Sequence, residues 1–202
     1  MQKLRYLPLI LTLVLISSTH AQEMHGGHGD AGMSPLAGLA GEAFETGFMS
    51  MMIAHHQGAI AMSEWILEHS ERPEVRETAE AIIASQEEEI LTMREWLQDW
   101  YGQEPDADMV EMMRAEDEGM MQEMMAHEDT EVGFLTAMTE HHDGAIDMAQ
   151  LALTRAVHGE LRALARDIIV EQAEEIYRFQ EWLSEMSAGE TTAPKRSLMS
   201  QR

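Results

Sequence analysis

Apolar side chains recur at helical spacing along most of the chain. Phe48, Met52, Ala59 and Ile66 are four or seven positions apart, so they fall on one face of an α-helix. A second apolar stripe with the same period covers residues 75–97, and both stripes return later in the chain. Sustained alternation of apolar and polar residues, which is typical of strands, is not found. The pattern therefore predicts an all-α fold.

The stripes return because the chain contains an internal repeat. A shift of 86 positions aligns residues 48–97 with residues 134–183 without a gap, and 21 of the 50 aligned positions are identical. Pro73 in the first copy and Gly159 in the second divide each copy into two helices. Since each helical hairpin has one apolar face to bury, we expect the hairpins to pack together as an antiparallel four-helix bundle with a ferritin-like arrangement.

The N-terminus has the layout of a secretory signal. Lys3 and Arg5 precede an apolar run at residues 7–16, and small and polar residues follow it. The run is too short to cross a bilayer, so we expect cleavage and a periplasmic or secreted protein with no membrane attachment; an uncleaved anchor is the alternative. The expected segments are a signal peptide (1–21), a flexible Gly/His/Met arm (22–43), repeat 1 (44–101), a Met-rich connector with a short helix (102–130), repeat 2 (131–186) and a disordered tail (187–202).

Charge and cysteine content exclude several classes of function. The chain has 37 acidic and 13 basic residues and a formal net charge of −24, which excludes nucleic acid as a partner because phosphate contacts require lysine and arginine. It has no cysteine and 19 methionines. Disulfides, thiolate metal sites and a cysteine nucleophile are therefore excluded, and any soft-metal chemistry must use methionine and histidine.

Two adjacent histidines in each copy fall on the apolar face of the first helix. On the second helix, Glu89 also falls on the apolar face, where a carboxylate needs a partner. His55 and Glu89 are each 17 residues from Arg72 in the turn, so we expect them to lie at one level, as we expect for His141 and Glu175. The expected clusters are His55, His56, Gln86 and Glu89 in the first copy and His141, His142, Gln172 and Glu175 in the second, with Met52, Met62, Met138 and Met148 on the same stripes.

Two interpretations of these clusters remain open. In the first, the imidazoles bind a metal ion and the glutamates and glutamines orient them from the outer shell. In the second, the histidine–glutamate contacts are hydrogen bonds that only fix the register of the helices.

The connector uses methionine for most of its apolar bulk. No Leu, Ile or Phe occurs in residues 109–125, and many of the methionines are three or four positions apart, so their side chains meet on one helix face. Thioethers are soft ligands that select Cu(I), and by the same logic Ag(I); ordinary packing is the alternative. The candidate ligands are Met109, Met112, Met113, Met120, Met121, Met124, Met125 and His127.

The glycine-rich arm contains a further set of candidate ligands. Glycine allows a chain to fold around one ion, so this arm is either a metal-scavenging segment or a plain linker. The residues are Met24, His25, His28 and Met33.

The segment around each histidine pair resembles the signature of a bacterial family. Both copies contain His-His-x-Gly-Ala-Ile-x-Met, which is similar to the motif of domain-of-unknown-function family 305 (DUF305). The resemblance covers roughly residues 44–186 and implies a ferritin-like bundle; some family members are exported copper-binding proteins linked to copper tolerance. The motif carries over to His55, His56, Met62, His141, His142 and Met148. Thr139 and Glu140 replace Ile53 and Ala54 of the first copy, so the halves are not expected to bind alike.

Together these features favour a non-enzymatic copper-binding protein. It would sequester Cu(I), or Ag(I), or deliver the ion to a copper exporter or an acceptor protein, and so contribute to copper homeostasis or tolerance. A structural or partner-binding bundle is the main alternative. A di-metal carboxylate oxidase has less support, because such sites use Glu-x-x-His and the repeated helices lack that motif. A bundle that binds haem through Met/His axial ligands is a further alternative, but nothing in the sequence requires it.

Overall fold

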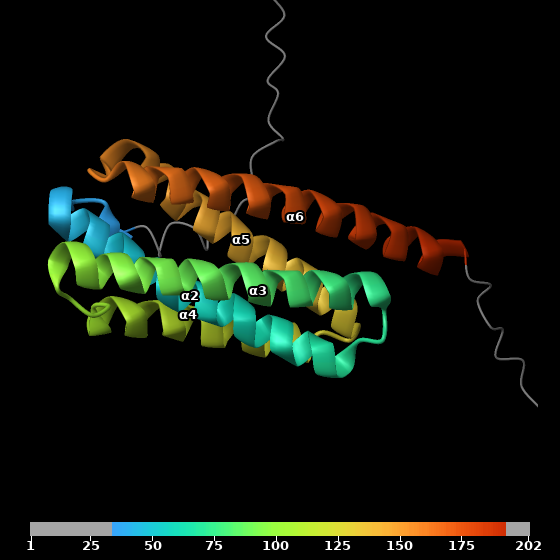
Figure 1. Cartoon of the computed structure of the whole chain (residues 1–202). Helices are drawn as coiled ribbons and strands as arrows, with labels where there is room; N and C mark the ends of the chain where they lie inside the picture. The colour runs from blue at the N-terminus through green and yellow to red at the C-terminus, as the bar shows by residue number, and fades with distance from the viewer. Residues whose placement is uncertain (1–33, 193–202) are drawn as a thin grey trace, which may run out of the picture.

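The part of the chain that the structure describes is all-helical, which confirms the predicted fold class (Figure 1). The computed structural model describes residues 34–192, and no strand occurs within them. The expected signal peptide and the arm ligands Met24, His25, His28 and Met33 lie outside these residues. The helices are η1 (Ser34–Leu36), α2 (Gly41–His69), α3 (Pro73–Trp96), the π-helical turn η2 (Leu97–Tyr101), α4 (Ala107–Ala126), α5 (Thr130–Arg155) and α6 (Gly159–Thr192).

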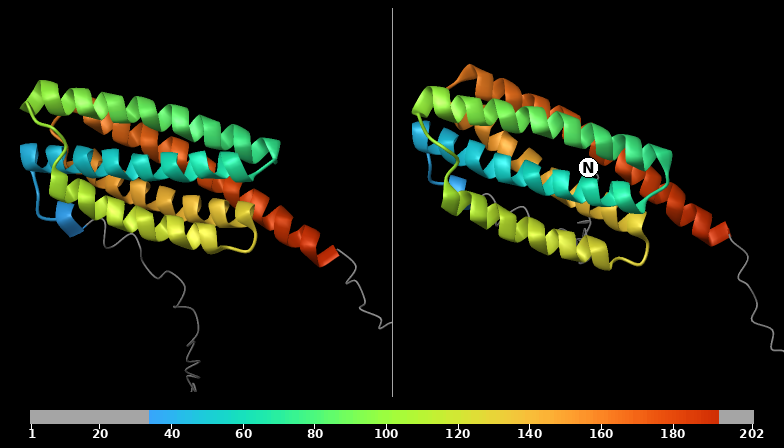
Figure 2. Two further views of the ribbon diagram at one scale, coloured as in Figure 1. Left: turned by 90° about the horizontal axis from the view of Figure 1, so that it is seen from below. Right: turned by 60° about the horizontal axis from the view of Figure 1, so that its bottom comes forward.

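Two helical hairpins, α2–α3 and α5–α6, correspond to the two copies of the repeat. The central helices α2 and α5 pack against each other, and α4 packs against both of them. The two views of Figure 2 show α4 lying along this central pair. The connector, which we expected to contain a short helix, is a 20-residue helix. The packed structure therefore contains one long helix more than the four expected from the repeat.

Side chains at the helix ends explain where the elements begin. The carboxylate of Asp106 accepts hydrogen bonds from the backbone N–H groups of Asp108 and Met109 at the start of α4, and Asp129 caps α5 in the same way. Such caps satisfy donors that the first helical turn leaves free. The repeated arginines, Arg76 and Arg162, donate to backbone carbonyls at the end of the preceding helix. Each arginine thereby ties the two helices of its hairpin together.

Two expected boundaries differ from the structure. The flexible arm was expected to include residues 34–40, but Leu36 is fully buried, and Arg155 Nη1 donates to the carbonyl oxygens of Leu36 and Ala37 at 2.9 Å each. The disordered tail was expected from residue 187, but α6 continues to Thr192. A helix is disfavoured at the residue before a proline, and Pro194 follows two positions later.

Methionine is a major component of the core in the repeated helices as well as in α4. Met49, Met51, Met52 and Met138 are all completely buried, beside the phenylalanines of α2 and α5. The adaptable thioether fills irregular gaps between helices. Within residues 34–192, none of the helices combines the length and the apolar character needed to cross a lipid bilayer.

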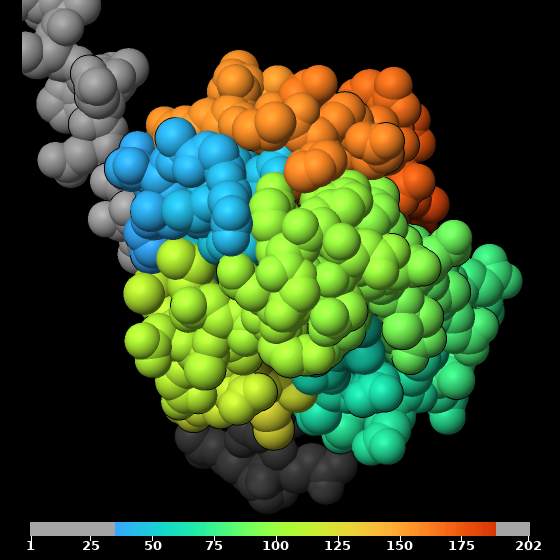
Figure 3. Space-filling view, turned by 60° about the vertical axis from the view of Figure 1, so that its left-hand side comes forward, coloured from blue at the N-terminus to red at the C-terminus, as the bar shows by residue number. Residues whose placement is uncertain are grey.

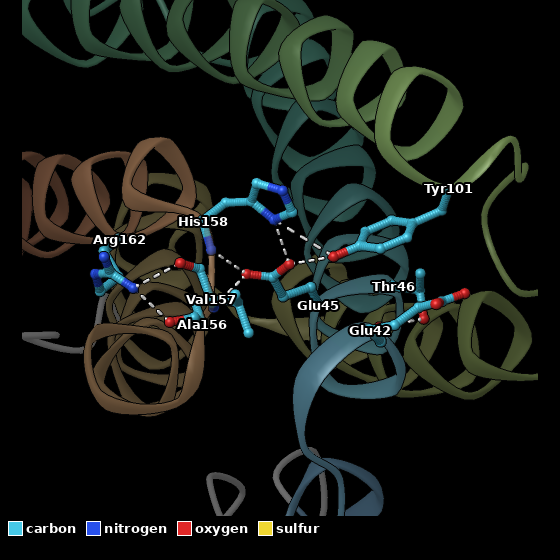
Figure 4. A network of polar contacts seen from close by, with 8 residues as sticks. All are labelled: Glu42, Glu45, Thr46, Tyr101, Ala156, Val157, His158 and Arg162. Atoms are coloured by element: carbon cyan, nitrogen blue, oxygen red, sulfur yellow. Dashed lines mark hydrogen bonds and ion pairs between the residues drawn. The ribbon is translucent and has the colours of Figure 1, made fainter.

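A buried carboxylate holds one end of the bundle together (Figure 4). Glu45 of α2 is fully buried, and its Oε1 accepts from the backbone N–H groups of Val157 at 2.5 Å and His158 at 2.8 Å. Its Oε2 accepts from His158 Nδ1 at 2.7 Å and from the Tyr101 hydroxyl. Figure 3 shows the α2, η2 and α5–α6 segments meeting at this end. We call these residues the Glu45 network.

The electrostatics of this network favour a charged glutamate. Burial by itself raises the pKa of Glu45, but the hydrogen bonds from Tyr101, His158 and Val157 outweigh burial, so the pKa is lowered below its ordinary value. Burial and the carboxylate together raise the pKa of Tyr101. The His158 ring also stacks on Trp100, with centroids 3.9 Å apart. The network therefore fixes α2, η2 and the α5–α6 turn relative to one another.

Candidate metal centre

Four histidines are buried where α2 and α5 pack together. His55 is 4% exposed, and His56, His141 and His142 are at most 1% exposed, which confirms that both pairs face inward. The rings of His55 and His141 lie against each other, with centroids 3.7 Å apart and an interplanar angle of 34°. We call these four residues the histidine core. It joins the two copies of the repeat at their equivalent positions.

Two of the four imidazoles contact a glutamate of their own hairpin. His56 Nε2 lies 2.6 Å from Glu89 Oε2, and His142 Nε2 lies 2.8 Å from Glu175 Oε2. The expected partners, His55 for Glu89 and His141 for Glu175, are therefore wrong by one residue. One residue changes the level along a helix by only 1.5 Å but turns the side chain by 100°, so the helix face decides the partner.

The helix faces explain where the other two histidines point. His55 and His141 meet each other across the α2–α5 contact instead of facing α3 and α6. Burial, followed by the neighbouring histidines, lowers the pKa of both imidazoles well below the usual range. Both rings are therefore neutral at pH 7, the state in which imidazole binds a metal.

Asp117 of α4 is a member of this site that the sequence analysis missed. Its Oδ1 lies 3.2 Å from His141 Nε2, and its side chain is 11% exposed. Burial raises the pKa of Asp117 to about 8, although His56 acts in the opposite direction. The available signal was its spacing, because the three buried residues of α4 are Met113, Asp117 and Met124, four and seven positions apart, on one helix face.

A glycine of the repeated motif makes room for this carboxyl group. A Cβ atom on Gly58 would lie 2.4 Å from Asp117 Cγ, far inside contact distance. The equivalent Gly144 faces His55, whose Nε2 would lie 3.3 Å from an added Cβ. The same glycine therefore accommodates a carboxyl group of α4 in one half and an imidazole in the other.

Several buried polar atoms around the histidine core have no hydrogen-bond partner in the described part of the chain. They include the Nδ1 atoms of all four histidines and the Oε1 atoms of Gln86 and Gln172, which are each 3% exposed. Buried polar atoms are normally paired, because an unpaired one has lost its water. The histidine core therefore contains several buried ring nitrogens and amide oxygens that have no partner among the described residues.

Thioethers occur on the same helices as the imidazoles. Met52 and Met138 are completely buried, and Met62 and Met148 are 1% and 2% exposed.

Among residues 34–192, no three histidine, aspartate or glutamate side chains converge in a geometry that would hold a metal ion.

The methionines of α4 differ in how deeply they are buried. Met113 and Met124 are buried and pack into different parts of the core. Met109, Met120 and Met121 are half-buried, while Met112 and Met125 are 41% and 52% exposed. The expectation that several sulfurs are reachable from solvent is confirmed. His127 is exposed just beyond α4, and its Nδ1 contacts the backbone of Asp129.

A groove between α2 and α4 leads from the surface to Asp117. It has a volume of about 600 Å³, and its walls include Gln57 and Gly58 of α2 and Arg114, Asp117 and Met121 of α4. The small side chains of α2 and the long ones of α4 give the groove its shape. It places a half-buried thioether and a buried carboxyl group along one opening.

Comparison with known proteins identifies relatives of this arrangement. The sequence matches the profile of DUF305, a domain of unknown function, over residues 45–183, with overlapping matches over 16–90 and 131–202. No protein with curated annotation matches.

Solved structures with this fold include CopM in its Cu(II)-bound form, at 30% sequence identity and a TM-score of 0.60, covering 70% of this chain and 97% of that one. CopM in an Ag-bound form has 31% identity and a TM-score of 0.61, covering 70% and 95%. A DUF305 protein from Streptomyces coelicolor has 28% identity and a TM-score of 0.62, covering 70% and 92%.

Proposed function

This chain belongs to the DUF305 family, and from that premise we propose that it is an exported copper-binding protein. Its cargo is Cu(I), and Ag(I) by the same ligand chemistry. The protein sequesters the ion or delivers it to an exporter or an acceptor protein, and it catalyses no reaction. Export depends on the signal peptide at residues 1–21 and leads to the periplasm or the exterior.

The observation that carries this proposal is the set of unpartnered Nδ1 atoms in the histidine core. In His56 and His142, a glutamate carboxylate lies at Nε2 while Nδ1 is buried without a partner. Metal-binding histidines use this arrangement, because a carboxylate on one ring nitrogen fixes the tautomer and leaves a lone pair on the other. The imidazoles are therefore prepared as ligands.

The neighbouring sulfurs favour a soft ion over a hard one. Buried Met52, Met62, Met138 and Met148 lie on the same helices as the imidazoles, and neutral thioethers select Cu(I) and Ag(I). The CopM structures with copper and silver support the same choice of metals. In this proposal the ferritin-like four-helix arrangement of the two hairpins holds the inner ligands in register.

The methionines of α4 and the N-terminal arm form the outer part of the proposed site. The exposed and half-buried sulfurs of α4 meet the ion first and pass it inward. Glu89 and Glu175, with Gln86 and Gln172, orient the inner ligands. The outer ligands are Met109, Met112, Met120, Met121, Met125 and His127, together with the buried Met113 and Met124, and Met24, His25, His28 and Met33 in the arm.

An anaerobic competition titration tests the proposal. The protein from residue 22 onward is titrated with Cu(I) against a chromophoric chelator, beside one variant with the seven α4 methionines changed to leucine and one with the four core histidines changed to leucine. We expect wild type to take Cu(I) from the chelator and both variants to retain less. Failure of the folded wild-type protein to compete would refute the proposal and favour a structural bundle.

A further inference from the structure

Asp117 occupies a position at which an apolar residue would be the simpler choice. It is one of three buried residues of α4, and the other two are Met113 and Met124. A carboxyl group removed from water costs free energy that a methionine or leucine would not cost. Packing alone therefore does not explain an aspartate at this position.

The contact that Asp117 makes is the one that the glutamates make in the hairpins. Glu89 and Glu175 lie at the Nε2 atoms of His56 and His142 at 2.6 and 2.8 Å. Asp117 lies at Nε2 of His141 at 3.2 Å. Three of the four core imidazoles therefore have a carboxyl group at the same ring nitrogen.

The third carboxyl group comes from outside the repeat and reaches only one of the two halves. It enters through the space left by Gly58, whereas the equivalent space at Gly144 faces the His55 ring. The ring of His55 lies against the ring of His141. The contacts form one continuous line from Gly58 through Asp117, His141 and His55 to Gly144.

We propose that Asp117 is a positioning residue that fixes the ring of His141 and so makes α4 part of the inner metal site. Asp117 orients the ring of His141 directly, and the contact between the two rings then fixes the orientation of His55. The Met-rich helix and the histidine core act as one unit, because the carboxyl group that prepares an inner ligand is carried by the helix that carries the outer sulfurs. This inference rests on the proposed copper-binding function.

Four single substitutions separate this role from a general effect on packing. Asp117→Leu removes the acceptor, and Asp117→Asn retains one acceptor oxygen in nearly the same volume. Gly58→Ala leaves Asp117 in the chain but places a Cβ atom 2.4 Å from its Cγ position. Gly119→Ala is the matched control on α4, because a Cβ atom there meets nothing within 4 Å.

The first readout uses the metal-free protein and so does not depend on copper. The ring-nitrogen NMR shifts of His141 show which ring nitrogen carries the proton. We expect wild type, Asp117→Asn and Gly119→Ala to show a single tautomer, because the contact at Nε2 is kept. Asp117→Leu and Gly58→Ala are expected to show a mixture of tautomers.

The second readout is the affinity for Cu(I) in the competition titration. We expect Asp117→Leu and Gly58→Ala to weaken binding about 10- to 100-fold, as loss of an orienting partner does in other metal sites. Asp117→Asn should stay closer to wild type, and Gly119→Ala should equal it.

Unchanged His141 shifts in Asp117→Leu and Gly58→Ala, or unchanged affinity in both, would overturn this inference and leave the proposed function standing. Failure of wild type to bind copper would overturn both. If Asp117→Leu does not fold, the comparison of Gly58→Ala and Asp117→Asn with wild type decides the question by the same two measurements.

Discussion

Two regions of this protein place carboxyl groups against histidines, and they satisfy the polar atoms to different degrees. In the Glu45 network, one carboxylate accepts four hydrogen bonds, from Tyr101, Val157 and two groups of His158. In the histidine core, each carboxyl group reaches one ring nitrogen and the other ring nitrogen has no partner. Both regions are buried between helices of the same bundle.

This difference distinguishes a network that stabilises the fold from a group of side chains that can bind a ligand. A fully satisfied buried network makes the structure rigid and selects one arrangement of the chain. A buried imidazole with an unused lone pair contributes less to stability, since part of its polar surface has lost water without replacement. The comparison therefore assigns the stability of the bundle end to the Glu45 network and ligand binding to the histidine core.

The largest expected effect is the loss of stability in Glu45→Ala. The substitution leaves the donors of Tyr101 and His158 without their common acceptor, and breaking a buried network of this kind costs about 3 to 5 kcal/mol of the free energy of unfolding. Urea denaturation measures the loss. Copper stoichiometry per folded molecule should not change. Glu42→Ala is the control, because the contact of Glu42 with Gln103 is exposed, and a large loss there would break the comparison.

The opposite pattern is expected in the histidine core. The double substitutions His56→Leu/Glu89→Leu and His142→Leu/Glu175→Leu each replace a polar pair by apolar groups, which is often neutral for stability or raises it. The affinity for Cu(I) should fall at least about tenfold, or 1.4 kcal/mol. Urea denaturation and the chelator titration are run on the same samples. A large loss of stability with unchanged affinity for Cu(I) would show that these contacts stabilise the fold and do not serve metal binding.

The buried carboxyl group of Asp117 makes the stability of the fold depend on pH near neutrality. Burial raises the pKa of Asp117 to about 8, so between its unfolded value and pH 8 the folded protein keeps a proton that the unfolded chain has lost. The free energy of unfolding therefore falls as pH rises. The lowered pKa values of His55 and His141 have the opposite effect, but only below about pH 6.5.

The test of this dependence is urea denaturation at pH 6.5, 7.0 and 7.5. Between these values we expect the free energy of unfolding to fall by about 1.4 kcal/mol per pH unit in wild type. Asp117→Asn should remove most of this slope. Equal slopes in the two proteins would show that the carboxyl group of Asp117 titrates as it does in the unfolded chain.

The smallest expected effect comes from Ser63, a buried polar residue of α2 outside the histidine core. Its Oγ has no hydrogen-bond partner in the described part of the chain, and the equivalent position in the second copy is Ala149, which is also fully buried. Ser63→Ala should raise the free energy of unfolding by about 1 kcal/mol, because an unsatisfied hydroxyl is removed. Thermal unfolding measures the shift, and Cu(I) affinity should stay the same. A loss of copper affinity would place Ser63 among the ligands.

The sequence predicted the features that depend on periodicity. The repeat gave the two hairpins, and the helical wheel placed His55, His56, His141 and His142 inside because a 100° turn per residue is a reliable guide to the buried face. It did not choose the correct partner of Glu89, since neighbouring residues lie at nearly the same level. That choice depends on how far one helix is rotated about its axis against another.

Asp117 was missed for a different reason. Residues 107–126 contain many charged side chains, so the segment resembles a solvated helix. This segment also lies outside the repeat, so there is no second copy to compare it with. Packing of α4 on both α2 and α5 is a tertiary property. Only the helical spacing of Asp117 to Met113 and Met124 pointed to its burial. A single charged residue on an apolar face is usually interpreted as the edge of that face.

The entry of α4 at Gly58 but not at Gly144 has a consequence for the history of the chain. Two identical hairpins in a symmetric dimer must carry every substitution twice, so any feature built on one side is copied on the other. Once the two hairpins are joined in one polypeptide, each copy can change separately. The joining helix is itself a single element beside a duplicated one, and it gives one histidine a neighbour that its twin lacks. Joining the two hairpins in one chain therefore allows the two histidine pairs to differ, and the single helix α4 makes them differ at His141.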